Sequence, residues 1–93
     1  MTKTVVVVED EPDLRTIYQK VLESAGYRVI VGGHGAEGVT VVRRNHADLV
    51  IMDLRMPIMD GWRALEYLKA DARTSKVPVW AMSAHLQAEV AAH

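Results

Sequence analysis

LVIMDLRMPIMDG, residues 49–61, is the most informative stretch of this 93-residue chain. Its first four residues are apolar and predict a short strand that is buried on both faces. One carboxylate, Asp53, follows the strand, and Pro57 and the pair Asp60-Gly61 then indicate a loop. Because open α/β sheets bind ligands beyond the carboxyl ends of their strands, Asp53 is predicted to stand at a functional position.

Strand and helix patterns alternate on both sides of this stretch. The β-branched run at residues 4–8 predicts a strand with both faces covered. Pro12 suits the first residue of a helix, and Gly26 suits the left-handed residue that ends one. The apolar residues of this helix recur on one face, at Leu14, Ile17, Tyr18, Val21, Leu22 and Ala25.

The remaining elements continue the alternation. Strands are predicted over residues 27–31, 48–53 and 78–82, and helices over residues 35–45, 61–70 and 84–92. Gly38 weakens the second helix, since glycine costs roughly 1 kcal/mol relative to alanine in a helix interior. One face of the third helix is marked by Trp62, Ala64, Leu65 and Leu68. This order predicts a single α/β domain over residues 1–93, with a parallel sheet between two layers of helices.

The composition is that of an ordinary globular domain, with 49% apolar and 25% charged residues. The formal net charge of −1 gives no basic field that would attract nucleic acid or an anionic membrane. The chain has no cysteine, which excludes disulfides, thiolate catalysis and Cys-ligated zinc. No apolar run approaches the ~20 residues of a bilayer-spanning helix, and no signal-peptide pattern opens the chain, so we expect a cytoplasmic protein.

Carboxylates also follow the first predicted strand, at Glu9 and Asp10. The first and third strands of a doubly wound sheet are neighbours, so these two residues are expected to share a crevice with Asp53. Three carboxylates there need a compensating cation, and hard oxygen ligands favour Mg²⁺ over zinc or copper. Ser83 follows the fourth predicted strand, where its hydroxyl could donate to an anionic group in the crevice or cap the next helix.

Three segments together resemble the receiver domain of bacterial two-component response regulators. They are VVVVEDEP at residues 5–12, IMDLRMPIMDG at residues 51–61 and VPVWAMSA at residues 77–84. The resemblance implies a flavodoxin-like, doubly wound parallel sheet in three α/β/α layers. A complete receiver continues with a fifth strand, a lysine at the end of that strand and a last helix. Because no lysine follows Lys76, we expect a receiver domain that is truncated before these elements, with four strands present.

The resemblance implies a role for each residue of the crevice. Asp53 looks like the phosphoacceptor, which takes a phosphoryl group from the phosphohistidine of a sensor histidine kinase. The implied ligands of Mg²⁺ are Glu9, Asp10, Asp53 and the backbone carbonyl of Arg55. Ser83 looks like the switch hydroxyl, supported by the backbone N–H of Ala84. The implied chemistry is self-catalysed phosphotransfer and dephosphorylation, so we expect no enzyme that turns over outside substrates.

Two alternatives to this function remain open. The chain could be an interaction or dimerisation module derived from a receiver, whose switching is impaired by the missing lysine. It could also be a Mg²⁺-dependent phosphatase, although that class usually has an Asp two residues after its nucleophile, where this chain has Arg55. Without the fifth strand of a complete receiver, the fourth strand would be an open sheet edge, so we expect a homodimer that pairs this edge and the C-terminal segment.

Overall fold

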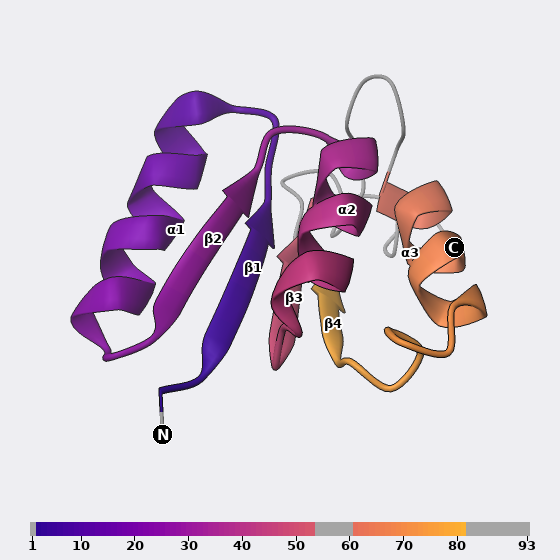
Figure 1. Cartoon of the computed structure of the whole chain (residues 1–93). Coiled ribbons are helices and arrows are strands. Elements are labelled where there is room, and N and C mark those ends of the chain that lie inside the picture. Colours follow the sequence, from indigo (N-terminus) through magenta and orange to yellow (C-terminus); the bar gives the residue numbers. More distant parts are fainter. Residues whose placement is uncertain (1, 54–60, 82–93) are drawn as a thin grey trace, which may run out of the picture.

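The protein folds as a parallel four-stranded sheet with helices on both faces (Figure 1). The structure is a computed structural model, and it describes residues 2–53 and 61–81. Its strands are β1 (Thr4–Val8), β2 (Arg28–Gly32), β3 (Leu49–Met52) and β4 (Val79–Ala81). Its helices are α1 (Pro12–Ser24), α2 (Gly35–Asn45) and α3 (Gly61–Ala70). This order confirms the predicted α/β fold, while the helix predicted over residues 84–92 lies outside the described residues.

The strands run parallel in the order β2-β1-β3-β4. In this register Val8 of β1 lies between Gly32 of β2 and Met52 of β3. The order is that of a doubly wound, flavodoxin-like sheet, in which the winding reverses at β1. The carboxyl ends of β1 and β3 therefore lie side by side, at the upper edge of the sheet in Figure 1.

Two apolar clusters hold the helices to the sheet. The cluster under α2 and α3 includes Val6, Val8, Val50, Met52 and Leu68. The cluster under α1 includes Val5, Val7 and Ile51. Successive residues of a strand point to opposite faces, so the valines of β1 contribute to both clusters, and every residue of β1 is buried. The prediction that both faces of this strand are covered is confirmed.

Gly38 allows α2 to approach β1 closely. A Cβ at this position would lie 2.6 Å from Val8 Cγ2 and 2.7 Å from Val8 Cγ1. The helical cost of this glycine is therefore offset by close packing of α2 on the most buried strand of the sheet.

The boundary of β2 differs from the prediction by one residue. The backbone N–H of Tyr27 donates to the carbonyl of Leu22 at 3.1 Å, in the turn that ends α1. Tyr27 therefore belongs to the helix terminus, and β2 begins at Arg28. Gly26 has φ = 95°, the left-handed conformation that the sequence predicts for the end of this helix.

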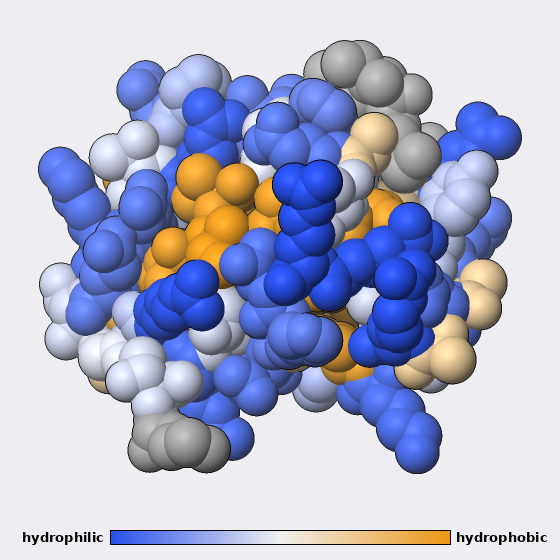
Figure 2. Space-filling view, in the orientation of Figure 1, coloured by the Kyte–Doolittle hydropathy of each residue, from blue (hydrophilic) through white to orange (hydrophobic). Residues whose placement is uncertain are grey.

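The apolar faces predicted for α1 and α3 are only partly buried. Ile17 and Val21 are 54% and 63% exposed, and Trp62 is 53% exposed. α1 packs against β1 and β2 through Tyr18 and Leu22, so its flank with Ile17 and Val21 extends beyond that contact. On the opposite face of the sheet, apolar surface is also visible between α1 and α2 (Figure 2). The helical spacing thus predicted the helices correctly but not the width of their buried faces.

Candidate functional site

Three carboxylates meet at the carboxyl ends of β1 and β3. Glu9 and Asp10 directly follow β1, and Asp53 directly follows β3. The backbone N–H of Asp53 donates to the carbonyl of Val8 at 3.0 Å, which fixes the end of β3 against β1. One carboxylate oxygen from each of Glu9, Asp10 and Asp53 lies within 4.8 Å of the other two. The structure therefore brings together the three carboxylates that the sequence places in one crevice.

Glu9 is the most deeply buried member of this acidic site, with 4% of its surface exposed. Burial, together with hydrogen bonding and charge from Asp53 and Asp10, raises the pKa of Glu9 to about 8. The carboxylate of Glu9 also accepts a hydrogen bond from the backbone N–H of Asp10 at 3.0 Å. A proton on Glu9 thus relieves the repulsion among three carboxylates that lie so close together.

The phenol of Tyr18 lies close enough to the acidic site for its pKa to be affected by the same negative charge. Burial raises the pKa of the Tyr18 phenol, and the nearby charges of Glu9 and Asp53 raise it as well. The phenol belongs to the cluster under α1, so its role in the described structure is packing.

The acidic site suits a hard divalent cation. Its three described donors are carboxylates, and their oxygens are close enough to share one ion. A cation would replace the proton of Glu9 as the source of compensating charge. The raised pKa of Glu9 and the oxygen-only donor set therefore both fit Mg²⁺.

The β2–α2 connection and α1 support the backbone around Glu9. The N–H of Glu9 donates to the carbonyl of Gly32 at 3.0 Å, and its carbonyl accepts from Nη1 of Arg15 at 3.2 Å. Nearby, Glu37 Oε1 accepts from the N–H of Gly33 at 2.8 Å, while His34 Nδ1 accepts from the N–H of Glu37 at 3.3 Å. The sequence interpretation missed Arg15 and Glu37, although the acidic residue three positions after the helix cap was a usable signal for Glu37.

The other predicted site residues cannot be placed. Arg55, Ser83 and Ala84 lie outside the described residues, so their assigned roles stay predictions.

A second charged cluster lies at the opposite end of the sheet, where α3 leads into β4. Arg43 Nε and Arg73 Nη2 each lie 2.9 Å from Asp71 Oδ2. The hydrogen bonds and charge of Arg73, with the charge of Arg43, hold the pKa of Asp71 below its usual range. Arg43 therefore ties α2 to the α3–β4 loop.

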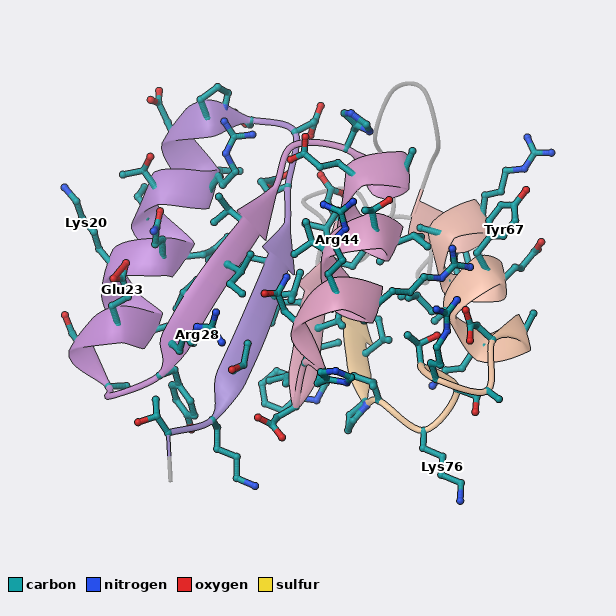
Figure 3. The ribbon with its side chains drawn as sticks, in the orientation of Figure 1. Lys20, Glu23, Arg28, Arg44, Tyr67 and Lys76 are labelled. Carbon is teal, nitrogen blue, oxygen red and sulfur yellow. The ribbon has the colours of Figure 1, made fainter. Side chains whose placement is uncertain are left out.

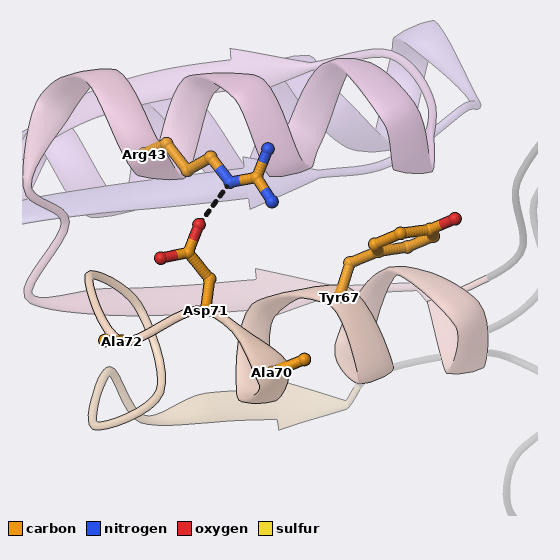
Figure 4. A pocket seen from close by; sticks show the side chains of 5 residues that line it. All are labelled: Arg43, Tyr67, Ala70, Asp71 and Ala72. Atoms are coloured by element: carbon orange, nitrogen blue, oxygen red, sulfur yellow. Dashed lines mark ion pairs between the residues drawn. The ribbon is translucent and has the colours of Figure 1, made fainter.

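A shallow pocket of about 370 Å³ lies beside this cluster (Figure 4). It is lined by Arg43, Tyr67, Ala70, Asp71 and Ala72. Its charged groups compensate one another, and Lys69 Nζ adds hydrogen bonds to the carbonyls of Ser75 and Val77 in the same loop. This arrangement explains the loop structure without a ligand.

The chain belongs to the response regulator receiver domain family, because the family model matches residues 5–93. The polar-differentiation response regulator DivK of Brucella ovis is 33% identical over 84 residues, which cover 90% of this chain and 68% of DivK. Protein PilH of Pseudomonas aeruginosa is 35% identical over 75 residues, which cover 81% of this chain and 62% of PilH. The family resemblance seen in the sequence motifs is confirmed.

Solved structures agree with this family and fold. The receiver domain of the sensor histidine kinase PA1611 from Pseudomonas aeruginosa matches this chain with a TM-score of 0.88 at 30% identity. The match covers 98% of this chain and 75% of the PA1611 domain. That structure has a magnesium ion coordinated in its active-site cleft. Chemotaxis protein CheY4 of Vibrio cholerae has a TM-score of 0.84 at 23% identity, over 99% of this chain and 80% of CheY4, and supports the fold.

Among residues 2–53 and 61–81, no helix is both long and apolar enough to span a membrane.

Proposed function

We propose that this chain is a phosphoacceptor receiver module, in which Asp53 takes a phosphoryl group from the phosphohistidine of a sensor histidine kinase. The observation that carries the proposal is the convergence of Glu9, Asp10 and Asp53, each with one carboxylate oxygen within 4.8 Å of those of the other two. Asp53 stands at the tip of β3, at the end of the sheet where a donor can reach it. Membership in the receiver family supports this assignment.

The proposed transfer is a direct displacement at phosphorus. One carboxylate oxygen of Asp53 attacks the phosphorus in line with the bond to the donor imidazole. The P–N bond breaks, the imidazole leaves as the neutral base after taking up a proton, and an aspartyl phosphate forms. Hydrolysis of that acyl phosphate by water regenerates Asp53 and releases inorganic phosphate. This is stoichiometric self-modification, so we propose no turnover of outside substrates.

The chain's own residues prepare Asp53 for this step. Glu9, Asp10 and Asp53, with the backbone carbonyl of Arg55, would hold a Mg²⁺ ion. When bound, Mg²⁺ supplies positive charge that offsets the repulsion between the carboxylates and the phosphoryl oxygens. Glu9 must release its proton to act as a ligand, and the hydrogen bond from the Asp53 N–H to Val8 keeps the nucleophile beside β1. In this scheme Ser83 and the N–H of Ala84 contact the phosphoryl oxygens.

The donor and location follow from this chemistry. A sensor histidine kinase is the proposed phosphodonor, and we place the transfer in the cytoplasm, where a kinase has access to ATP and Mg²⁺. The same acidic site makes the interaction-module alternative less favourable, because binding alone gives no reason to bring three carboxylates together at an energetic cost.

We also propose self-association through β4. Within the described residues, β4 pairs on one side only, with β3, and Trp80 is 60% exposed. An exposed apolar strand edge favours pairing with a second copy.

Phosphorylation by a small-molecule donor tests the main proposal. We expect acetyl phosphate with Mg²⁺ to add the mass of one phosphoryl group to the intact protein, and we expect Asp53→Asn to abolish the addition. Asp13→Asn is the matched control, because Asp13 is an exposed carboxylate in the first turn of α1, and this variant should be labelled like the wild type. A folded wild-type protein that stays unlabelled, or an Asp53→Asn variant labelled to the same extent, would overturn the proposal.

A further inference from the structure

Arg15 contacts the acidic site through the main chain. Its Nη1 donates to the backbone carbonyl of Glu9 at 3.2 Å. That carbonyl belongs to the peptide unit that joins Glu9 to Asp10, two of the three carboxylate residues of the site. Because a peptide unit is planar, holding its oxygen restricts rotation of the whole unit. The contact therefore restricts the directions in which both side chains leave the backbone.

Gly33 leaves the space that the guanidinium occupies. A Cβ on Gly33 would lie 3.0 Å from Nη1 of Arg15, a contact so tight that the guanidinium would have to shift by a few tenths of an ångström. Gly33 does not have a positive φ, so a side chain here is opposed by lack of room rather than by backbone conformation. Its N–H is held by Glu37 at 2.8 Å, which limits movement of the loop away from Arg15.

The remaining backbone contact of Glu9 completes the arrangement. Its N–H donates to the carbonyl of Gly32, the residue that precedes Gly33. The end of β1 is thus held on its N–H side by β2 and on its carbonyl side by α1. The restraint on the carbonyl side comes from a single side chain, that of Arg15.

We propose that Arg15 is a positioning residue for the acidic site, which orients Glu9 and Asp10 through their shared peptide, and that Gly33 serves to leave room for its guanidinium. The inference rests on the proposed function, since it takes Glu9 and Asp10 as ligands of Mg²⁺. Groups that orient metal ligands without touching the metal change its affinity by about 10–100-fold when they are removed. Arg15→Met keeps most of the apolar stem and removes the donors, so it weakens Mg²⁺ binding by about tenfold with every ligand still present.

Lys20 provides a control for charge alone. It is exposed on the same helix and points away from the sheet (Figure 3). Lys20→Met removes one positive charge, as Arg15→Met does, but leaves the Glu9–Asp10 peptide untouched. An effect of net charge on Mg²⁺ binding would appear in both variants, whereas an effect of position appears only at Arg15.

The test is calorimetric titration with Mg²⁺ of the wild type, Arg15→Met, Lys20→Met, Gly33→Ala and the double variant of Arg15 and Gly33. We expect about tenfold weaker binding for Arg15→Met, weaker binding for Gly33→Ala, and a change below about twofold for Lys20→Met. The double variant should bind no more weakly than Arg15→Met, because the new methyl group then has no guanidinium to displace. Binding by Arg15→Met within twofold of the wild type, or effects that multiply in the double variant, would overturn the inference.

Two further measurements keep the result interpretable. Thermal unfolding in EDTA establishes that each variant is folded, and a purely structural role would lower the midpoint while leaving the Mg²⁺ affinity of the folded protein unchanged. A wild-type protein that binds no Mg²⁺ would contradict the proposed function itself. Normal binding by both the wild type and Arg15→Met would contradict only the role of Arg15.

Discussion

The pKa values of carboxyl groups shift in opposite directions at the two ends of the sheet. At the carboxyl end, Glu9, Asp10 and Asp53 converge, and burial with mutual repulsion raises the pKa of Glu9 to about 8. At the other end, Asp71 lies between Arg43 and Arg73, and its pKa falls below the usual range. Asp71 is compensated by two arginines, whereas burial and mutual repulsion in the acidic site favour a proton on Glu9. This contrast distinguishes a carboxylate that ties α2 to the α3–β4 loop from the carboxylates that we propose bind a cation.

Removal of one carboxylate from each end gives the largest expected contrast. We predict that Asp10→Asn weakens Mg²⁺ binding by about tenfold or more, since it removes one charged ligand of a hard cation. Asp71→Asn should leave Mg²⁺ affinity unchanged, because Asp71 lies at the other end of the sheet. Calorimetric titration of both variants measures the difference, and equal losses would show that the two ends are not independent.

The acidic end also predicts how stability depends on pH without metal. The pKa of Glu9 is raised from 4.5 to about 8 on folding, so the folded state binds more protons between these pH values. The free energy of unfolding in EDTA should therefore fall as the pH rises from about 4.5 to about 8, and Glu9→Gln should flatten this fall.

Denaturant titrations at several pH values measure this dependence, with Asp13→Asn as the control that keeps the wild-type slope. Mg²⁺ should oppose the loss of stability at high pH, because it binds the ionised carboxylates of the folded state. A flat profile for the wild type between these pH values would contradict the raised pKa of Glu9.

Substitution of Asp71 should affect stability rather than function. Asp71→Asn removes the ion pairs to Arg43 and Arg73, which link α2 to the α3–β4 loop. We expect a small decrease in the thermal midpoint, since ion pairs that water partly screens contribute little, with unchanged labelling of Asp53 by acetyl phosphate. Lys76→Met is the control, because Lys76 is an exposed cation in the same loop (Figure 3). A loss of labelling in Asp71→Asn would assign Asp71 a functional role.

The smallest expected effect concerns self-association. Trp80 is exposed on β4, and Trp80→Ser should shift the molecule toward the monomer if the β4 edge pairs with a second copy. Multi-angle light scattering over a range of protein concentrations measures the shift. Trp62→Ser is the control, since Trp62 is similarly exposed but lies on α3. A wild-type protein that stays monomeric at micromolar concentration would exclude the pairing.

The sequence predicted the acidic site because strand ends are visible in local patterns. The apolar runs before Glu9 and Asp53 fixed both as strand-end carboxylates, and the alternating strands and helices placed β1 beside β3. Arg15 could not be assigned in this way, because an arginine in an amphipathic helix has many possible partners. The same holds for Asp71 in the α3–β4 loop, whose partner Arg43 comes from α2.

The exposure of Ile17 and Val21 illustrates a further limit of periodicity. Their spacing correctly predicted the helix, but burial depends on which strands the helix covers, and α1 packs on β1 and β2. Gly38 shows the reverse case, in which a residue unfavourable to a helix is required by close contact with Val8. Helix formation is thus encoded locally, whereas the extent of burial is set by tertiary packing.

The central claim is that the carboxyl end of the sheet binds the cation on which phosphorylation depends. Titration of ¹⁵N-labelled protein with Mg²⁺ tests it most directly, because backbone amide shifts report binding at each residue. We predict the largest shifts at Glu9, Asp10 and Asp53, with little change at Asp71 and Arg73. Shifts centred on Asp71, or none at the three carboxylate residues, would contradict the account.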